Sequence, residues 1–267
     1  MIPILVRFVT GRGSLWAPIF FVGAVAFGYI INVAIPSLTP PIPSPPEYTA
    51  EEYYAAARTV LQEANLLCDT AIDEGVVGIG ADVAATYAKD VLCVSVVGGV
   101  RVKESLFSGL LTRMGTLAYY SPLTAEVILN TDQPTVAIGI SAVHELMHYY
   151  GVMREDEAVF HAYVAAKGAD SAYLRYCAAI CALGYLGKTL YALSYEKYCA
   201  LMSEADTRVT KSLSERRDFA NKALQIDVAD TLRDGAMHLS DSRGVDSYNG
   251  ASRLIVRYLL GSQGSGR

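Results

Sequence analysis

The sequence predicts a mainly α-helical domain with a small β-sheet (an α+β fold), preceded by one N-terminal transmembrane helix. The stretch "LWAPIFFVGAVAFGYIINVAI" (residues 15–35) carries no charge over 21 positions. Apolar residues recur at helical spacing through much of the chain after residue 50. By contrast, "TLAYYSPLTAEVILN" (residues 116–130) is rich in strand-forming residues on either side of Ser121-Pro122, which predicts a strand or a hairpin.

The composition favours a protein that resides partly in a membrane and has no nucleic-acid partner. Hydrophobic residues make up 52% of the chain and charged residues 18%, against about 25% charged in ordinary globular domains. The mean hydropathy of +0.27 agrees with this. The net charge is −5 and no basic block occurs, which argues against nucleic-acid binding. The five cysteines include no C-x-x-C pair, so neither a disulfide framework nor a cysteine zinc site is predicted.

The charge-free stretch 15–35 is long enough to cross the ~30 Å hydrocarbon core of a bilayer as a helix. The alternative, a cleaved signal peptide, usually has an apolar part of only about 7–15 residues. Arg7 and Arg12 precede the stretch, and no basic residue follows until Arg58. The positive-inside rule therefore predicts that residues 1–14 are a short cytoplasmic N-terminus. The protein is expected to be a single-pass membrane protein with an extracytoplasmic domain.

After the membrane helix, the sequence predicts a linker, one domain and a flexible tail. Residues 36–49, "PSLTPPIPSPPEYT", are proline-rich and are expected to form an extended spacer. Residues 50–260 form the predicted domain, and the Gly/Ser-rich residues 261–267 form the tail. Thr49 and Glu52 match a capping box, which predicts that a helix begins there.

Within the domain, the predicted elements differ in how clearly the sequence defines them. Residues 76–88 and 91–102 mix glycine with β-branched residues and stay ambiguous between helix and strand. The long apolar helix at residues 171–194 carries Arg175 and Lys188 and is either a buried core helix or membrane-embedded. The other predicted helices are at residues 137–150, from about residue 153 onward, within the polar region 196–232, and in the amphipathic stretch "DSYNGASRLIVRYLLG".

His144, Glu145 and His148 form an H-E-x-x-H motif, the strongest chemical signal in the chain. Residues four apart lie on one face of a helix, so both imidazoles can reach one Zn²⁺ ion. The glutamate lies beside them and is expected to take a proton from a zinc-activated water rather than bind the metal. Of the two remaining histidines, His161 is expected to pack or support, and His238 to be structural or exposed.

A third metal ligand is expected in the acidic stretch that follows. Gly151 matches the glycine of the metzincin pattern H-E-x-x-H-x-x-G-x-x-H, but Arg154 occupies the position of its third histidine, and arginine cannot bind zinc. The gluzincin arrangement instead takes a glutamate from a following helix. Glu155 and Glu157 are the candidates, with Asp156 less suitable. A tight helical hairpin at the glycine favours Glu157.

The stretch "HELMHYYGVMREDEAVFHAYVAA" resembles a bacterial family of membrane-attached candidate zinc metallopeptidases whose pattern is roughly H-E-L-x-H-x-x-G-F-x-R-E-D-E-A-N-F-x-A-Y-L-A. The resemblance extends over about residues 113–260, through "YYSPLTAEVILN" and "DSYNGASRLIVRYL", and includes the membrane helix. It implies a gluzincin-like fold in which the third ligand opens an E-x-x-A-D or E-x-x-A-N motif. Glu155 is then the ligand, because Ala158 lies three residues on. Val159 replaces the expected Asp or Asn, so a supporting hydrogen bond is expected to be missing.

The resemblance also implies how a substrate would lie in the site. Residues 117–130 would act as an edge strand that pairs with an extended peptide through main-chain hydrogen bonds. Tyr119, Tyr120 and Tyr248 are candidates for polarising the scissile carbonyl, and the sequence does not choose among its 18 tyrosines.

Together these features predict a membrane-anchored metallopeptidase that acts on a peptide or protein substrate. His144, His148 and Glu155 (alternatively Glu157) would hold one Zn²⁺ ion, and Glu145 would act as the general base. The first alternative is a non-proteolytic membrane protein that keeps a structural or sensory zinc site. The second is a small transporter or assembly factor, which the polar stretch after residue 194 disfavours.

Overall fold

The computed structural model describes residues 37–72, 75–94, 100–222 and 247–264, and the predicted transmembrane helix at 15–35 lies outside them. These residues form a mainly helical domain with a small sheet, as predicted. The helices are α3 (Ala50–Leu67), α4 (Val76–Asp90), α5 (Ser108–Arg113), α6 (Thr135–Tyr149), α7 (Glu155–Lys167), α8 (Ala172–Leu193), α9 (Tyr195–Ser203), α10 (Thr207–Lys222) and α12 (Ser247–Gly264). The strands are β1 (Arg101–Glu104), β2 (Ala118–Ser121) and β3 (Glu126–Leu129).

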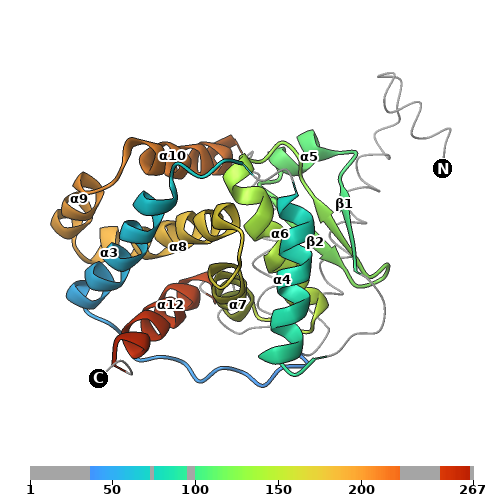
Figure 1. Ribbon diagram of the computed structural model, residues 1–267, viewed down its shortest axis with the longest axis horizontal. Coiled ribbons are helices and arrows are strands. Elements are labelled where there is room, and N and C mark those ends of the chain that lie inside the picture. The colour runs from blue at the N-terminus through green and yellow to red at the C-terminus, as the bar shows by residue number, and fades with distance from the viewer. Residues whose placement is uncertain (1–36, 73–74, 95–99, 223–246, 265–267) are drawn as a thin grey trace.

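The sheet lies at one end of the domain, and α3, α8, α9 and α10 lie at the other (Figure 1). Its strand order is β1-β3-β2, with β3 parallel to β1 and antiparallel to β2. The predicted hairpin at residues 116–130 is therefore confirmed as β2 and β3. The expectation that residues 117–130 as a whole form an edge strand is wrong: within this stretch, only β2 lies at an edge of the sheet. The reason is that β1, in the region that the sequence left ambiguous, pairs with β3 and makes it the central strand.

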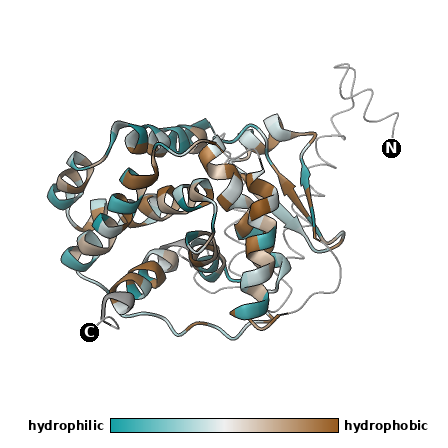
Figure 2. Ribbon diagram, in the orientation of Figure 1, coloured by the Kyte–Doolittle hydropathy of each residue, from teal (hydrophilic) through white to brown (hydrophobic). Residues whose placement is uncertain are grey.

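Helix α8 belongs to the hydrophobic core of the domain. It packs against α3, α6 and α7, and its buried residues include Leu174, Ile180 and Leu186, each fully shielded from solvent. By length and composition alone, α8 could also cross a membrane, but most of its apolar surface is covered by other helices. Core packing therefore accounts for its apolar sequence. In Figure 2 the hydrophilic colour is most continuous on α10, which covers one side of the domain.

Helix α4 resolves one of the ambiguous stretches, and one of its two glycines has a packing role. A Cβ atom on Gly80 would lie 3.1 Å from the side chain of Val143 on α6. Likewise, a Cβ atom on Gly139 of α6 would lie 2.6 Å from the side chain of Val76 on α4. The two helices approach each other at these glycines. This close approach explains Gly80, whereas a Cβ atom on Gly78 of the same helix would meet nothing within 4 Å.

Two predicted helix boundaries can be compared with the structure. The capping box of α3 is confirmed, since the Thr49 side chain and the Glu52 side chain each accept a hydrogen bond from the other residue's backbone N–H. The polar helical region that begins after α8 is divided into α9 and α10. Asn65 holds this break, because its side chain donates to the carbonyl of Glu204 (2.9 Å) and accepts from the N–H of Asp206 (2.9 Å). Residues 223–232 of the predicted region lie outside the described residues.

Candidate metal centre

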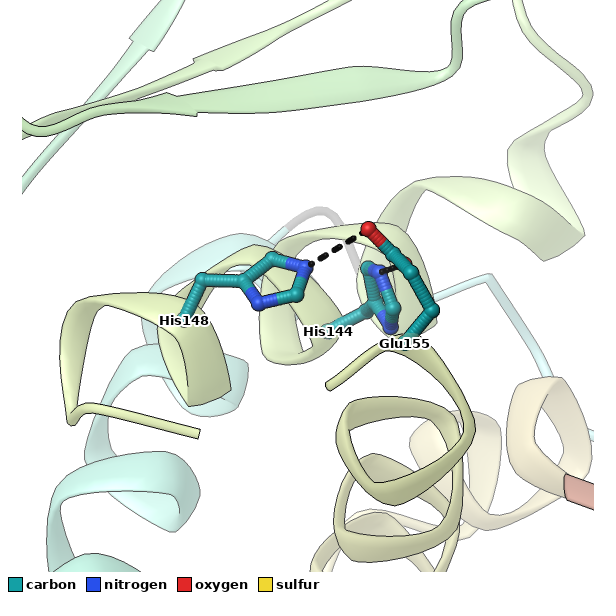
Figure 3. Close-up of side chains that lie close together, drawn as sticks. All are labelled: His144, His148 and Glu155. Atoms are coloured by element: carbon teal, nitrogen blue, oxygen red, sulfur yellow. Dashed lines mark ion pairs between the residues drawn. The ribbon is translucent and has the colours of Figure 1, made fainter. Parts of the chain in front are cut away.

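Three side chains with metal-binding chemistry converge where α6 meets α7. Figure 3 shows His144 and His148 of α6 facing Glu155, the first residue of α7. The Nε2 atoms of His144 and His148 lie 3.3 Å and 3.6 Å from the two carboxylate oxygens of Glu155. One potential ligand atom from each residue lies within 4.8 Å of the other two. Ligand atoms about 2.0–2.2 Å from a tetrahedral zinc ion lie roughly 3.3 Å apart, so this spacing suits one small cation.

The chain reverses direction between the two helices in a short turn. Gly151 adopts a φ of +91°, in the left-handed region that glycine enters without steric cost. The N–H groups of Gly151 and Val152 donate to the carbonyls of His148 and Met147, which is the Schellman arrangement that ends many helices. Arg154 is then the N-cap of α7. This turn brings the start of α7 against the histidine face of α6.

A backbone carbonyl orients His148 towards the carboxylate. The Nδ1 atom of His148 lies 2.8 Å from the carbonyl oxygen of Val152. Because a carbonyl can only accept, Nδ1 must carry the proton, so neutral His148 presents the lone pair of Nε2 to Glu155. The Oε2 atom of Glu155 is buried and makes no hydrogen bond. The Nε2 lone pair and the carboxylate of Glu155 both carry negative charge density, so their approach is unfavourable unless a proton or a cation lies between them. The residues therefore fit a bound metal ion.

The electrostatics of this pair favour positive charge. Burial by itself lowers the pKa of His148, but the Glu155 carboxylate more than offsets it and raises the pKa to about 9. Burial likewise raises the pKa of Glu155, yet the two histidines, His148 first, hold it well below its ordinary range. The cluster therefore stabilises a cationic partner for the carboxylate, and a divalent ion would take the place of the protons.

Of the acidic residues proposed as third ligand, the structure brings Glu155 to the histidines. Glu157 is almost fully buried elsewhere: its Oε1 accepts from the N–H of Ile42 (2.8 Å) and forms an ion pair with Nε of Arg154 (3.0 Å). The side chain of Asp156 accepts a hydrogen bond from the backbone N–H of Glu157. The cluster contains Glu155 and not Glu157, which a tight hairpin at Gly151 favoured, and the helix expected from about residue 153 begins at Glu155. Glu155 is the first residue of α7 and faces the histidines. Residues two apart on a helix face different sides, so Glu157 points away from the cluster.

Glu145 lies beside the cluster and is almost fully buried. Burial raises the pKa of its carboxyl group, and the neighbouring His144 and His148 partly counteract this rise. The carboxylate also accepts a hydrogen bond from the backbone N–H of Tyr120 in β2. A carboxylate whose pKa is raised is a stronger proton acceptor than an ordinary glutamate, and this one lies beside the two histidines.

Strand β2 presents its outer edge to Glu145. The N–H of Asn130 donates to the carbonyl of Leu117, just outside the paired strands. In an antiparallel pair, hydrogen-bonded and non-hydrogen-bonded positions alternate, so the backbone N–H and C=O of Tyr120 point away from β3. The hydrogen bond from Tyr120 to Glu145 agrees with this orientation. Among the described residues no strand pairs with this edge of β2, and the edge borders the cluster.

The remaining candidates play other roles or lie outside the described part. His161 packs between helices, as predicted: its Nδ1 lies 2.8 Å from the Tyr87 hydroxyl, and burial lowers its pKa to about 4. The ring of Tyr120 packs edge-on against Tyr149. His238 and the side chain of Tyr248 lie outside the described residues. The two groups that sequence reasoning missed, the carbonyl of Val152 and the N–H of Tyr120, are main-chain atoms that carry no residue-type signal.

The fold and this cluster define an α+β protein with a candidate metal centre at a helix–turn–helix corner. A family described as protein of unknown function (DUF3810) matches residues 14–256. Because this match covers most of the chain, the protein belongs to that family. No curated protein and no solved structure matches the chain.

Proposed function

We propose that the protein is a zinc-dependent metallopeptidase. The observation that carries the proposal is the convergence of His144, His148 and Glu155, with Glu145 adjacent. Two imidazoles and one carboxylate are a donor set that zinc takes in hydrolytic sites, where a fourth position is left for water. Glu145 argues for catalysis rather than a structural or sensory role, because a structural zinc site needs no additional carboxylate.

When bound, Zn²⁺ would lower the pKa of a water molecule and stabilise negative charge on a carbonyl oxygen. His144, His148 and Glu155 would hold the ion. The carboxylate of Glu145 would take a proton from the attacking water and then pass it to the leaving amine. The raised pKa of Glu145 supports the second step, because a carboxylate with a higher pKa binds the proton from water more tightly before it passes the proton to the leaving amine.

The edge of β2 supports a peptide as substrate. An extended peptide could add to this edge through main-chain hydrogen bonds, which would bring its carbonyl groups near Glu145. Such pairing depends on the peptide backbone, so it suits substrates of varied side chains. Peptide hydrolysis fits this arrangement better than hydrolysis of a compact small molecule.

The proposal includes the gluzincin class and a membrane location. A third ligand at the start of a separate helix is the gluzincin arrangement. Val159 stands where related gluzincins carry Asp or Asn and is buried, so the supporting hydrogen bond of those enzymes is absent from that side chain. We further propose that residues 15–35 anchor the enzyme in the membrane and that the domain acts on the extracytoplasmic side.

The test is metal analysis and peptide cleavage with the full chain purified in detergent. Wild type is expected to contain one zinc ion and to cleave a library of unstructured peptides. His148→Ala is expected to lose the zinc. Glu145→Gln is expected to keep the zinc and lose cleavage by a factor of about 10²–10⁴. Wild type without zinc would refute the metal site, and zinc without cleavage would favour the structural or sensory alternative.

A further inference from the structure

Residues 37–42, which we call the strap, are bound directly to the turn between α6 and α7 and to the start of α7. The N–H of Leu38 and the hydroxyl of Ser37 both donate to the carbonyl of Gly151, each at 2.9 Å. The N–H of Met153 donates to the Ser37 hydroxyl at 3.4 Å. The side chain of Leu38 lies where a Cβ atom on Gly151 would be, with its nearest atom 2.7 Å away. The start of the proline-rich linker is thus fixed to the domain.

A second contact joins the strap to the first turn of α7. The N–H of Ile42 donates to Oε1 of Glu157 at 2.8 Å, and the same oxygen pairs with Nε of Arg154 at 3.0 Å. Arg154 is the N-cap residue immediately before Glu155. The carboxylate of Glu157 therefore ties the strap to the residue that precedes the third member of the metal cluster.

The residues that the strap contacts lie on both sides of Val152 and of Glu155 in the sequence, and these two positions determine the geometry of the cluster. Val152, whose carbonyl orients His148, lies between Gly151 and Met153, the two residues that the strap holds. Glu155 lies between Arg154 and Glu157. On the basis of the proposed function, we infer that the strap is a positioning element of the metal centre. It fixes the turn that aims His148 and the helix start that carries Glu155.

The rest of the linker provides an internal comparison, because it is bound to α12 and not to the turn. The guanidinium of Arg257 donates to the carbonyl of Pro43 at 2.9 Å, and Arg253 forms an ion pair with Glu47. In Figure 1 this segment runs past α7 and α12 before it enters α3. If the contacts served only to hold the linker to the domain, changes in either part of the linker should have the same effect. If the strap positions the metal centre, only changes in the strap should alter metal binding.

The test uses substitutions that remove single strap contacts. Ile42→Pro removes the N–H that binds Glu157, and proline suits this position because a residue before Pro43 is already confined to extended backbone. Ser37→Ala removes the hydroxyl contacts with the turn. Ser44→Pro is the matched control, since the N–H of Ser44 makes no hydrogen bond in the described part of the chain. Ile42→Val keeps the N–H and is the conservative variant.

Zinc affinity is measured on the full chain in detergent by competition with a chromophoric chelator, and the Co²⁺-loaded protein is examined by visible absorption. Ile42→Pro and Ser37→Ala are each expected to weaken zinc binding about tenfold and to change the Co²⁺ spectrum, with the melting temperature of the metal-free protein nearly unchanged. Ser44→Pro and Ile42→Val are expected to match wild type in both measurements.

The outcomes separate this inference from the proposed function. Wild-type zinc affinity and Co²⁺ spectra in both strap variants would overturn the positioning role while leaving the metallopeptidase intact. Equal losses in Ile42→Pro and Ser44→Pro would also overturn it, because proline in the linker would then be the cause. A wild-type chain that binds no zinc would refute the proposed function and, with it, the positioning of its ligands.

Discussion

The imidazole Nδ1 atom of His148 lies 2.8 Å from the carbonyl oxygen of Val152, a residue beyond the end of the same helix. The contact exists because Gly151 turns the chain back immediately after α6. It sets the tautomer of the imidazole and directs Nε2 at Glu155, which lies 3.6 Å away. The geometry of the cluster therefore depends on a turn as well as on the H-E-x-x-H spacing.

Gly151→Ala is expected to lower both stability and zinc affinity. A non-glycine residue at a φ of +91° is strained by about 1–3 kcal/mol, and its Cβ would overlap with Leu38. Chemical unfolding and chelator competition measure the two effects. Gly184→Ala is the control, since a Cβ there meets nothing within 4 Å in the middle of α8 and is expected to be neutral or slightly stabilising. Equal behaviour of the two variants would contradict the role of the turn.

Glu155→Ala is expected to reduce zinc affinity at least 100-fold, because it removes one of the three proposed ligands. Glu157→Ala is expected to keep one zinc per chain with affinity lowered only about tenfold, since this side chain acts through Arg154 and the strap. Metal analysis after dialysis distinguishes the two variants. If Glu157→Ala loses the metal and Glu155→Ala keeps it, the assignment of the third ligand is wrong.

The stability of the domain is expected to fall between about pH 6.5 and pH 4 because of His161. Burial lowers its pKa to about 4, below the ordinary value of about 6.5 that it has in the unfolded chain. The unfolded state therefore binds the proton more tightly, and stability present above pH 6.5 is lost as pH falls through this window, by roughly 3 kcal/mol. Unfolding free energies measured across the window are expected to fall less steeply for His161→Gln. An identical slope would rule out this histidine as the source.

Leu186→Ala is expected to destabilise the domain by about 2–5 kcal/mol, because this side chain is fully buried in α8. Leu193→Ala, at the end of the same helix where the side chain is 51% exposed, is expected to change stability by less than about 0.5 kcal/mol. Thermal unfolding of the detergent-purified chain compares them. Similar small effects at both positions would count against α8 as a core helix.

Local signals in the sequence identified several elements correctly. The capping box at Thr49 and Glu52 and the helical spacing of the two histidines depend on residues within four positions of each other. The hairpin around the Ser-Pro turn pairs residues at most 11 positions apart. Such features follow from backbone geometry and neighbouring side chains. Distant parts of the chain have little influence on them.

Contacts between distant segments decided the rest. The parallel pairing of β1 with β3 makes β3 the central strand, so within the hairpin only β2 lies at an edge of the sheet. The burial of α8 answered a question that its composition left open.

The sequence by itself determined the helical character of the domain, the two histidines on one helix face and an adjacent acidic stretch. Only the tertiary structure decided which acid meets the histidines, because Glu155 and Glu157 are chemically equivalent and differ only in direction. Their directions depend on where α7 begins and on the hydrogen bond from Ile42, a residue 115 positions away from Glu157. Contacts over that separation form only in the folded chain.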